Sequence, residues 1–239
     1  WARLARAQAM QGKLTVASES MDKALDLYGP IQVSGGGAIK VASNQIQSFS
    51  RMLSFAATLL ELGRFEDAKK LIREGLDLTD RPWIQDSPYY WRVFALAGLV
   101  AQDQGDGIEA KSYWERALEA VQKKDIRSGY IRGETHPDVV AIREELGWAL
   151  LRTGDPASGP LALSVSEARN KQVDQLFQFA SERERLVFLQ SFDPYSLLAE
   201  TGQIDALADT ILRYKGSVLD SVLEEQQLAA QANSQELQE

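Results

Sequence analysis

The sequence has no cysteine and a single histidine, His136, among its 239 residues. Without cysteine the chain cannot form a disulfide, supply a thiolate nucleophile, or bind zinc or an iron–sulfur cluster through thiolates. One histidine also excludes a multi-histidine metal site, so we expect no metal and no other cofactor. His136 could act as a general base, but it lies at the start of an expected helix, which favours an exposed or packing role.

Positive charge and long apolar runs are also scarce. The chain has 34 acidic and 26 basic residues and a net charge of -8, whereas nucleic-acid binding needs a surplus of Lys and Arg on one face. No apolar run reaches the roughly 18 residues of a transmembrane helix. We therefore expect no direct contact with nucleic acid or membrane, and a monomeric, cytoplasmic protein. The first residue is Trp1 rather than Met, so a longer or processed protein is expected, and the lack of a signal peptide in this sequence says nothing about export.

Four stretches of the sequence repeat one pattern of small residues and glycines. Each has a small residue, then a glycine seven positions later, another small residue five positions after that, and a fourth position seven further on. The four sets are Ala5, Gly12, Ala17 and Ala24; Ala56, Gly63, Ala68 and Gly75; Gly98, Gly105, Ala110 and Ala117; and Gly147, Gly154, Gly159 and Ser166. The glycine ends a helix with positive φ, and the small residues let helices approach closely. The pattern predicts antiparallel helix pairs that bury their apolar faces only by stacking.

The second and third stretches, LGRFEDAKKLIREGLDL and QGDGIEAKSYWERALEA, resemble the tetratricopeptide repeat (TPR). The resemblance implies an all-α, right-handed α-solenoid of about four repeats followed by C-terminal helices. The expected array covers residues 1–170, with repeats at about 1–29, 46–80, 88–124 and 136–170. The turn glycines are 51, 42 and 49 residues apart, more than the roughly 34 of the family. Long connections of the kinesin-light-chain style are therefore expected.

The expected connections carry their own signals. The first, residues 28–44, contains three consecutive glycines; a phosphate-binding loop is one interpretation, but no strand precedes it, so a mobile connection is favoured. In the second, Ser87 is expected to cap a helix that begins at Pro88. In the third, Thr135 and Asp138 form a variant capping box. In the fourth repeat, Pro156, Gly159 and Pro160 weaken the start of the second helix.

The sequence changes character after about Lys171, and residues 171–228 are expected to form a separate helical segment. Ser181 and Glu184 form a capping box that predicts a new helix. Asp193 and the following proline should end that helix and cap a short one, which Gly202 ends. A long amphipathic helix is expected from Gln203 onward. Residues 229–239 read as a flexible acidic tail.

This last region resembles the segment that joins TPR repeats to the peptidase domain of TPR–CHAT proteins, a caspase-like and separase-like family. The matching residues are Ser181, Glu182, Arg185, Leu186, Phe188, Leu189, Arg213, Lys215, Gly216, Val218, Leu219 and Asp220. The family's chemistry needs a His–Cys dyad beyond such a segment, so no catalytic residue can be assigned within this chain. For Lys215 and Gly216, a packing and kink role in the helix is favoured over contact with a substrate.

In the TPR family the first helices of the repeats line a concave groove that takes peptides or extended protein segments. The resemblance places the following residues there: Arg3, Arg6, Met10, Ser50, Leu53, Ala57, Leu60, Arg92, Leu96, Leu99, Gln102, Ala141, Glu144, Trp148 and Arg152. The arginines could clamp carboxylates of an acidic peptide. Trp148 has two interpretations that the sequence leaves equal: an exposed interface residue, or a residue buried by the third connection or the C-terminal helices.

The sequence leaves three classes of function to compare. The favoured one is a protein- or peptide-binding scaffold, the regulatory arm of a CHAT protease whose own catalytic domain is one possible partner. The alternative is a stand-alone TPR adaptor with no protease. An enzyme within this chain is the weakest interpretation, because the adjacent carboxylates of Glu144 and Glu145 point about 100° apart on a helix and do not share a site.

Overall fold

The computed structural model describes residues 2–28, 38–123, 131–179, 184–185, 193, 195–216 and 223. All regular secondary structure within these ranges is helical, so the expected all-α class is confirmed. Contacts divide the chain into two units, residues 1–133 and 134–239, each described here by itself. The expected helix from Ser181 and the acidic tail lie outside the described residues, apart from Glu184 and Arg185, which are helical.

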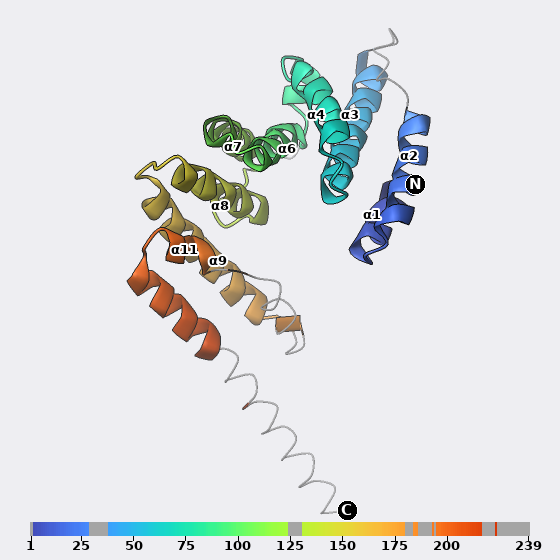
Figure 1. Ribbon diagram of the computed structural model, residues 1–239. Coiled ribbons are helices and arrows are strands. Elements are labelled where there is room, and N and C mark those ends of the chain that lie inside the picture. The colour runs from blue at the N-terminus through green and yellow to red at the C-terminus, as the bar shows by residue number, and fades with distance from the viewer. Residues whose placement is uncertain are drawn as a thin grey trace, which may run out of the picture. The chain divides into compact units, whose positions relative to one another are not determined.

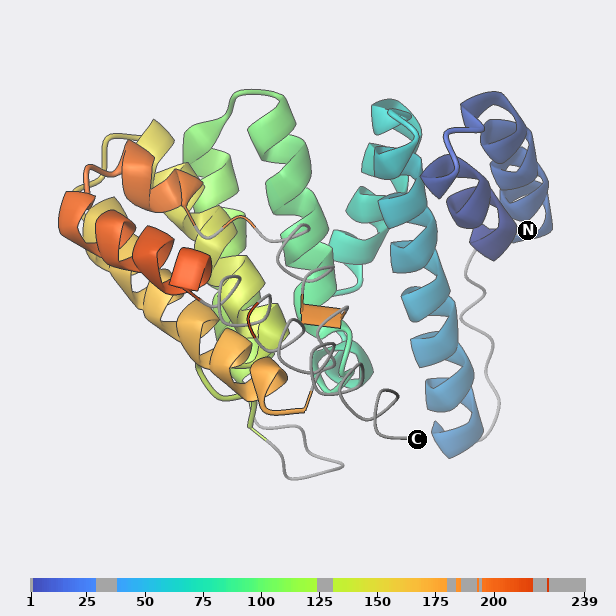
Figure 2. The ribbon, with the colours of Figure 1, turned by 90° about the horizontal axis from the view of Figure 1, so that it is seen from below.

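The described residues of unit 1 form three antiparallel hairpins (Figures 1 and 2). Their helices are α1 (Ala2–Met10) with α2 (Leu14–Tyr28), α3 (Ala38–Glu61) with α4 (Phe65–Asp77), and α6 (Tyr90–Asp103) with α7 (Gly107–Gln122). A one-turn helix, α5 (Pro82–Gln85), lies between the second and third hairpins. Both helices of the first hairpin contact α3, and both helices of the second contact α6. Each hairpin therefore covers one side of the next, as stacked repeats require.

The turns between paired helices share one hydrogen-bonding geometry. The four predicted turn glycines have φ between +69° and +76°, and Gly202 has φ +70°. In each turn, the N–H of the residue after the glycine donates to the carbonyl five residues earlier, as from Arg64 to Leu59 at 2.8 Å. This bond is characteristic of the Schellman motif, which needs a residue in the left-handed region. The predicted helix ends at these glycines are confirmed.

The predicted small residues lie where helices meet most closely. A Cβ atom on Gly98 would lie 2.7 Å from Cε2 of Trp114, across the α6–α7 hairpin. A Cβ atom on Gly75 of α4 would lie 2.9 Å from both Met52 of α3 and Val93 of α6. Gly98 therefore permits a close approach within its own hairpin, and Gly75 permits close approach both within its hairpin and to the next one.

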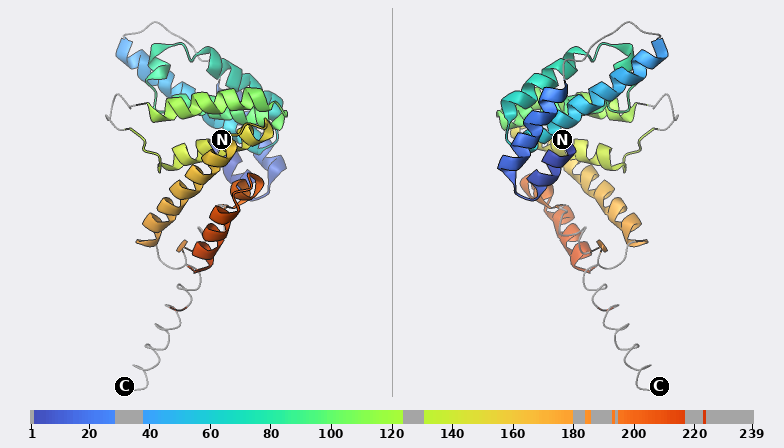
Figure 3. Two further views of the ribbon diagram at one scale, coloured as in Figure 1. Left: turned by 90° about the vertical axis from the view of Figure 1, so that its left-hand side faces the viewer. Right: turned by 90° about the vertical axis from the view of Figure 1, so that its right-hand side faces the viewer.

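Unit 2 contains α8 (Pro137–Arg152), α9 (Ser158–Phe177), α11 (Ser196–Glu200) and a helix over residues 204–216 (Figures 1 and 3). The boundary expected after residue 170 lies inside α9, which continues to Phe177. α11 and the helix 204–216 are joined through Gly202 with the same turn geometry as the repeats. They therefore form a fifth hairpin, and the helix 204–216 packs on α9 through Ser166 and Thr210.

Three helix starts differ from those expected. α3 begins at Ala38, about eight residues early, because the alanine- and valine-containing segment after the glycines can continue the helix. α6 begins at Tyr90 rather than Pro88, and the buried Ser87 hydroxyl instead accepts the N–H of Tyr89. α8 is capped by His136, whose Nδ1 accepts the N–H of Asp138, rather than by the expected threonine.

Candidate functional site

The first helices of unit 1 form a surface that we call the A face. α1 contacts α3, and α3 contacts α6, so their outward sides adjoin. The predicted binding residues of this surface whose side chains are described and at least partly exposed are Arg6, Met10, Ser50, Ala57, Leu60, Arg92, Leu99 and Gln102. Arg3 lies on α1, but its side chain is outside the described set.

Two of the predicted binding residues are not accessible. Leu53 has no exposed surface, and Leu96 is only 7% exposed. A Cβ atom on Gly75 would lie 3.7 Å from Cδ2 of Leu53, so this leucine packs inside the second hairpin. The expectation that Leu53 and Leu96 contact a ligand is wrong for this structure, because repeat packing already uses both side chains.

The charges of the A face differ in how they are paired. Arg6 forms an ion pair with Glu61 of α3, at 2.9 Å between Nη2 and Oε1. Arg92 is half-buried, and the structure gives it no ion pair within the described residues. Leu99 lies seven positions after Arg92 on α6 and is 39% exposed. Residues seven apart lie on one side of a helix, so this arginine and leucine face the same way.

Gln102 completes the set on α6. It is half-buried one turn beyond Leu99, and the residue takes part in an interaction within the protein. The α6 part of the A face thus combines an arginine, an exposed leucine and an amide. This arrangement can hold a segment that carries a carboxylate and an apolar side chain.

The predicted residues of unit 2 have different surroundings. Glu144 is half-buried and forms an ion pair with Arg169 of α9, so its charge is already matched. Trp148 is half-buried and packs against the cluster of Ala162, Leu197 and Leu198. Helices α9 and α11 therefore cover part of the Trp148 side chain, and the rest of it is exposed.

Other predicted positions of unit 2 remain accessible. Arg152 is exposed in the last turn of α8, with no ion pair among the residues that the structure describes. Ala141 is exposed as well. No group of three or more metal-ligating side chains occurs in the described part of the chain. No candidate membrane span occurs among the described helices.

A cavity of about 140 Å³ lies on the other side of α6, and the sequence analysis did not identify it. It is lined by Lys69, Ile72, Arg73 and Leu76 of α4, Ala97, Val100, Ala101 and Gln104 of α6, and Glu109 and Tyr113 of α7. Burial, together with the negative charge and hydrogen bonding of Glu109, raises the pKa of Tyr113, so the phenol stays protonated. Aligning the repeats by their turn glycines could have indicated this cavity, because the alignment places these α6 residues toward the preceding hairpin.

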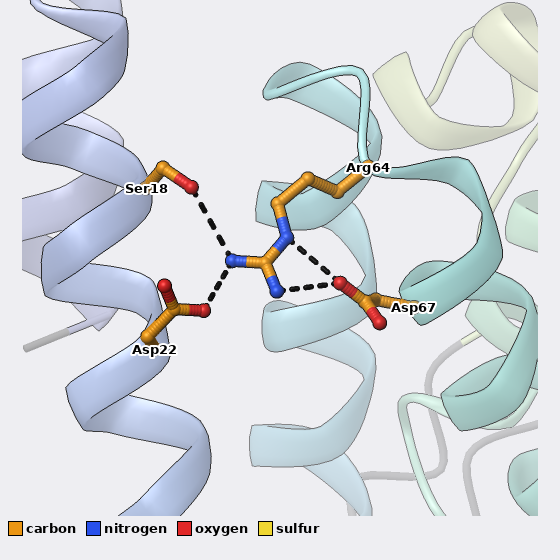
Figure 4. Close-up of polar contacts among 4 residues, drawn as sticks. All are labelled: Ser18, Asp22, Arg64 and Asp67. Carbon is orange, nitrogen blue, oxygen red and sulfur yellow. Dashed lines mark hydrogen bonds and ion pairs between the residues drawn. The ribbon is translucent and has the colours of Figure 1, made fainter.

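The hairpins of unit 1 are also joined by a polar cluster next to the second turn (Figure 4). The Arg64 guanidinium donates to Asp22 and Ser18 of α2 and to Asp67 of α4. Burial alone would lower the pKa of Arg64, but the two carboxylates outweigh it and raise the pKa. This arginine therefore holds together two adjacent repeats that present the A face.

Comparison with known proteins supports the fold. The chain is similar to two crystal structures of a kinesin light chain protein from Podosopora anserina with nearly identical TPR-like repeats, one of them a variant. Their TM-scores are 0.52 and 0.51 and their sequence identities 17% and 18%; each match covers 98% of this chain and 94% of the other. No protein-family model matches the chain, and no curated protein does. The similarity shows a TPR-like repeat fold.

Proposed function

We propose that this chain is a protein-binding scaffold, with no catalytic site of its own, whose A face in unit 1 receives an extended segment of a partner protein. The observation that carries the proposal is that Arg92 and Leu99 lie on the same side of α6 and are both accessible. Seven helical residues span about 10 Å. The expected ligand segment therefore has a carboxylate and an apolar side chain separated by about this distance.

The physical basis is the state of each group before binding. Arg92 has no ion pair in the described structure, so a ligand carboxylate need not displace an existing partner. Its half-buried position reduces screening by solvent relative to a fully exposed arginine. Leu99 offers apolar area that a ligand side chain would remove from water. Arg6 contributes less, because Glu61 already neutralises it.

A displayed library of random peptides, selected on the purified chain, tests this function. We expect enriched peptides to combine Asp or Glu with apolar residues. Their affinity, measured by fluorescence anisotropy, should fall about tenfold or more on Arg92→Glu and on Leu99→Ala. Arg73→Glu is the matched control, because Arg73 is an exposed arginine of the same unit that lines the cavity instead.

Selection that enriches no peptide, or enriched peptides that bind Arg92→Glu as tightly as the unmodified chain, would refute this use of the A face. A loss that is equal for Arg73→Glu and Arg92→Glu would attribute binding to net charge alone. Arg152→Glu is a separate test on unit 2: a partner with an acidic segment that binds unit 2 should bind this variant less tightly.

We further propose that this scaffold is the regulatory arm of a CHAT protease, which could itself be a partner. The support is the sequence resemblance of residues 181–189 and 213–220; within the described part, Arg213, Lys215 and Gly216 lie in the helix 204–216. Arg213 pairs with Asp174 of α9 at 2.8 Å, which gives it a structural role in unit 2. The reading frame after Glu239 tests this: an α/β domain with His and Cys supports the protease, and a stop codon supports the stand-alone adaptor.

A further inference from the structure

The contact between the second and third hairpins shows how one repeat receives the previous one. The second helix of one hairpin, α4, presents Lys69, Ile72, Arg73 and Leu76. The next hairpin presents Ala97, Val100, Ala101 and Gln104 from α6, with Glu109 from α7. These two sets of side chains face each other around the cavity. We use this α4–α6 contact as the reference for both ends of the repeat series.

The first hairpin carries the receiving surface with nothing described on it. When the two sequences are aligned with Gly12 opposite Gly105, each residue of α1 and α2 has an equivalent in α6 or α7. The equivalent residues, which we call the head face, are Leu4, Ala7, Gln8, Gln11 and Val16. Leu4 is 45% exposed, whereas Ala97, its equivalent, is 4% exposed; Val16, at the position of Glu109, is 46% exposed.

The fifth hairpin carries the opposite surface. Aligning Gly202 with Gly63 places the helix 204–216 on α4. The equivalents of the four α4 residues, which we call the tail face, are Ala208, Ile211, Leu212 and Lys215. Leu212 is 69% exposed and stands where α4 has Arg73; Ala208 is exposed and stands where α4 has Lys69. The tail face is therefore more apolar than the α4 surface that is already in contact with a following hairpin.

We propose that the tail face of one copy of the chain packs on the head face of a second copy, repeating the α4–α6 contact between molecules. Both faces expose leucine at positions that the reference contact uses. Burying this apolar area against a surface of the same hairpin geometry is favourable. The two faces are different surfaces, so the contact is head to tail and leaves one unused face on each member of a pair. This departs from the monomer expected from the sequence.

Sedimentation of the purified chain over a concentration series tests the assembly. We expect the average mass to rise with concentration, and Leu4→Glu and Leu212→Glu each to weaken association about tenfold or more. An equimolar mixture of these two variants should form one-to-one pairs, because one retains an intact tail face and the other an intact head face. Met10→Glu and Phe179→Glu are matched controls, since these exposed residues, 81% and 89%, lie outside both faces.

Because the chain has no cysteine of its own, single introduced cysteines allow a second test by cross-linking. Leu4→Cys and Leu212→Cys can be mixed and treated with a short bifunctional maleimide. Cross-links should form between the two variants and not within either variant alone, while Met10→Cys should not cross-link to Leu212→Cys. Circular dichroism establishes that each variant is folded.

The outcomes separate the alternatives. A chain that stays monomeric at its highest soluble concentration overturns the proposal and leaves the head face to another segment or partner. Cross-links within Leu4→Cys alone, or variants that fail to pair when mixed, would indicate a symmetric contact and overturn the head-to-tail assignment. Peptide binding to the A face is measured separately, so neither result decides the other.

Discussion

The indole ring of Trp114 lies directly over Gly98, where the two helices of the third hairpin cross. A Cβ atom at Gly98 would lie 2.7 Å from Cε2, 2.9 Å from Nε1 and 3.0 Å from Cδ2 of that ring. Trp114 is only 3% exposed, so the ring has little room to move. The small residue of the repeat pattern is thus required by one specific contact.

Replacing this glycine tests how tightly the hairpin is packed. Gly98→Ala should destabilise the protein by roughly 1–2 kcal/mol, because overpacking outweighs the better helix propensity of alanine. The midpoint of urea unfolding should move to lower concentration. Gly133→Ala is the control, since no atom lies within 4 Å of its added Cβ and its φ is not positive. Equal midpoints for Gly98→Ala and the unmodified chain would contradict the close contact.

The sequence predicted the first four hairpins because their turns and crossings are governed by local residues. A glycine at a fixed distance from two small residues specifies both a left-handed turn and a close helix crossing. The fifth hairpin keeps only the glycine. Its other three positions hold Tyr195, Leu207 and Tyr214, and the two tyrosine rings meet edge to face with centroids 5.9 Å apart. With α11 only five residues long, packing by large side chains replaces the close crossing, so the pattern does not reveal it.

The candidate site was predicted less well than the fold. Aligning the repeats by their turn glycines and small residues indicates which side of a helix a residue occupies. This alignment placed Arg92 and Leu99 on a partly exposed side of α6. It does not show whether neighbouring helices already cover that side, as they do at Leu53. The partner of Glu144, Arg169, lies 25 residues away on another helix, and its choice depends on tertiary packing. Such distant pairings cannot be read from local spacing.

A buried hydroxyl pair should stabilise the contact between α9 and the fifth hairpin. The Ser166 and Thr210 hydroxyl oxygens lie 3.3 Å apart, and the residues are 6% and 2% exposed. Ser166→Ala removes one partner and should cost about 1 kcal/mol, whereas adding Thr210→Val should recover most of that loss. Thermal unfolding of the two single variants and the double variant measures the coupling between the hydroxyls.

Ser164 provides the matched control for that cycle. Its Oγ is buried and has no hydrogen-bond partner in the described part of the chain. Ser164→Ala should therefore leave stability unchanged or raise it, since it removes an unsatisfied polar group. Independent, additive effects of Ser166→Ala and Thr210→Val would contradict the proposed coupling.

Arg64 should stabilise the contact between the first two hairpins. Its guanidinium joins Asp22 of α2 to Asp67 of α4, and its side chain is 25% exposed. Arg64→Ala should cost about 1–2 kcal/mol and increase amide exchange in α2 more than in α6. Arg64→Lys should retain only part of the stability that Arg64→Ala loses, because an ammonium group cannot reproduce the planar set of donors of a guanidinium.

Lys123→Ala is the comparison for Arg64, because the exposed Lys123 pairs only one helical turn away, with Glu119. Such a pair contributes only about 0.2–0.5 kcal/mol. Uniform loss of exchange protection throughout unit 1 in Arg64→Ala would show that the arginine stabilises the unit generally rather than one contact.

Asp193 should make the start of the fifth hairpin sensitive to acid. Its carboxylate accepts the N–H groups of Tyr195 and Ser196 and the Ser196 hydroxyl. Burial acts to raise the pKa of Asp193, but these hydrogen bonds outweigh it and lower the pKa from 3.8. The stabilisation is therefore fully present above the unfolded pKa and is lost as pH falls through the lower folded value.

Asp193→Ala should cost about 1 kcal/mol near neutral pH, and this difference in unfolding free energy should shrink below pH 3.8. Asp209→Ala, an exposed position on the helix 204–216, should show no comparable dependence. A difference between Asp193→Ala and the unmodified chain that persists unchanged in acid would assign the effect to packing rather than to the ionised carboxylate.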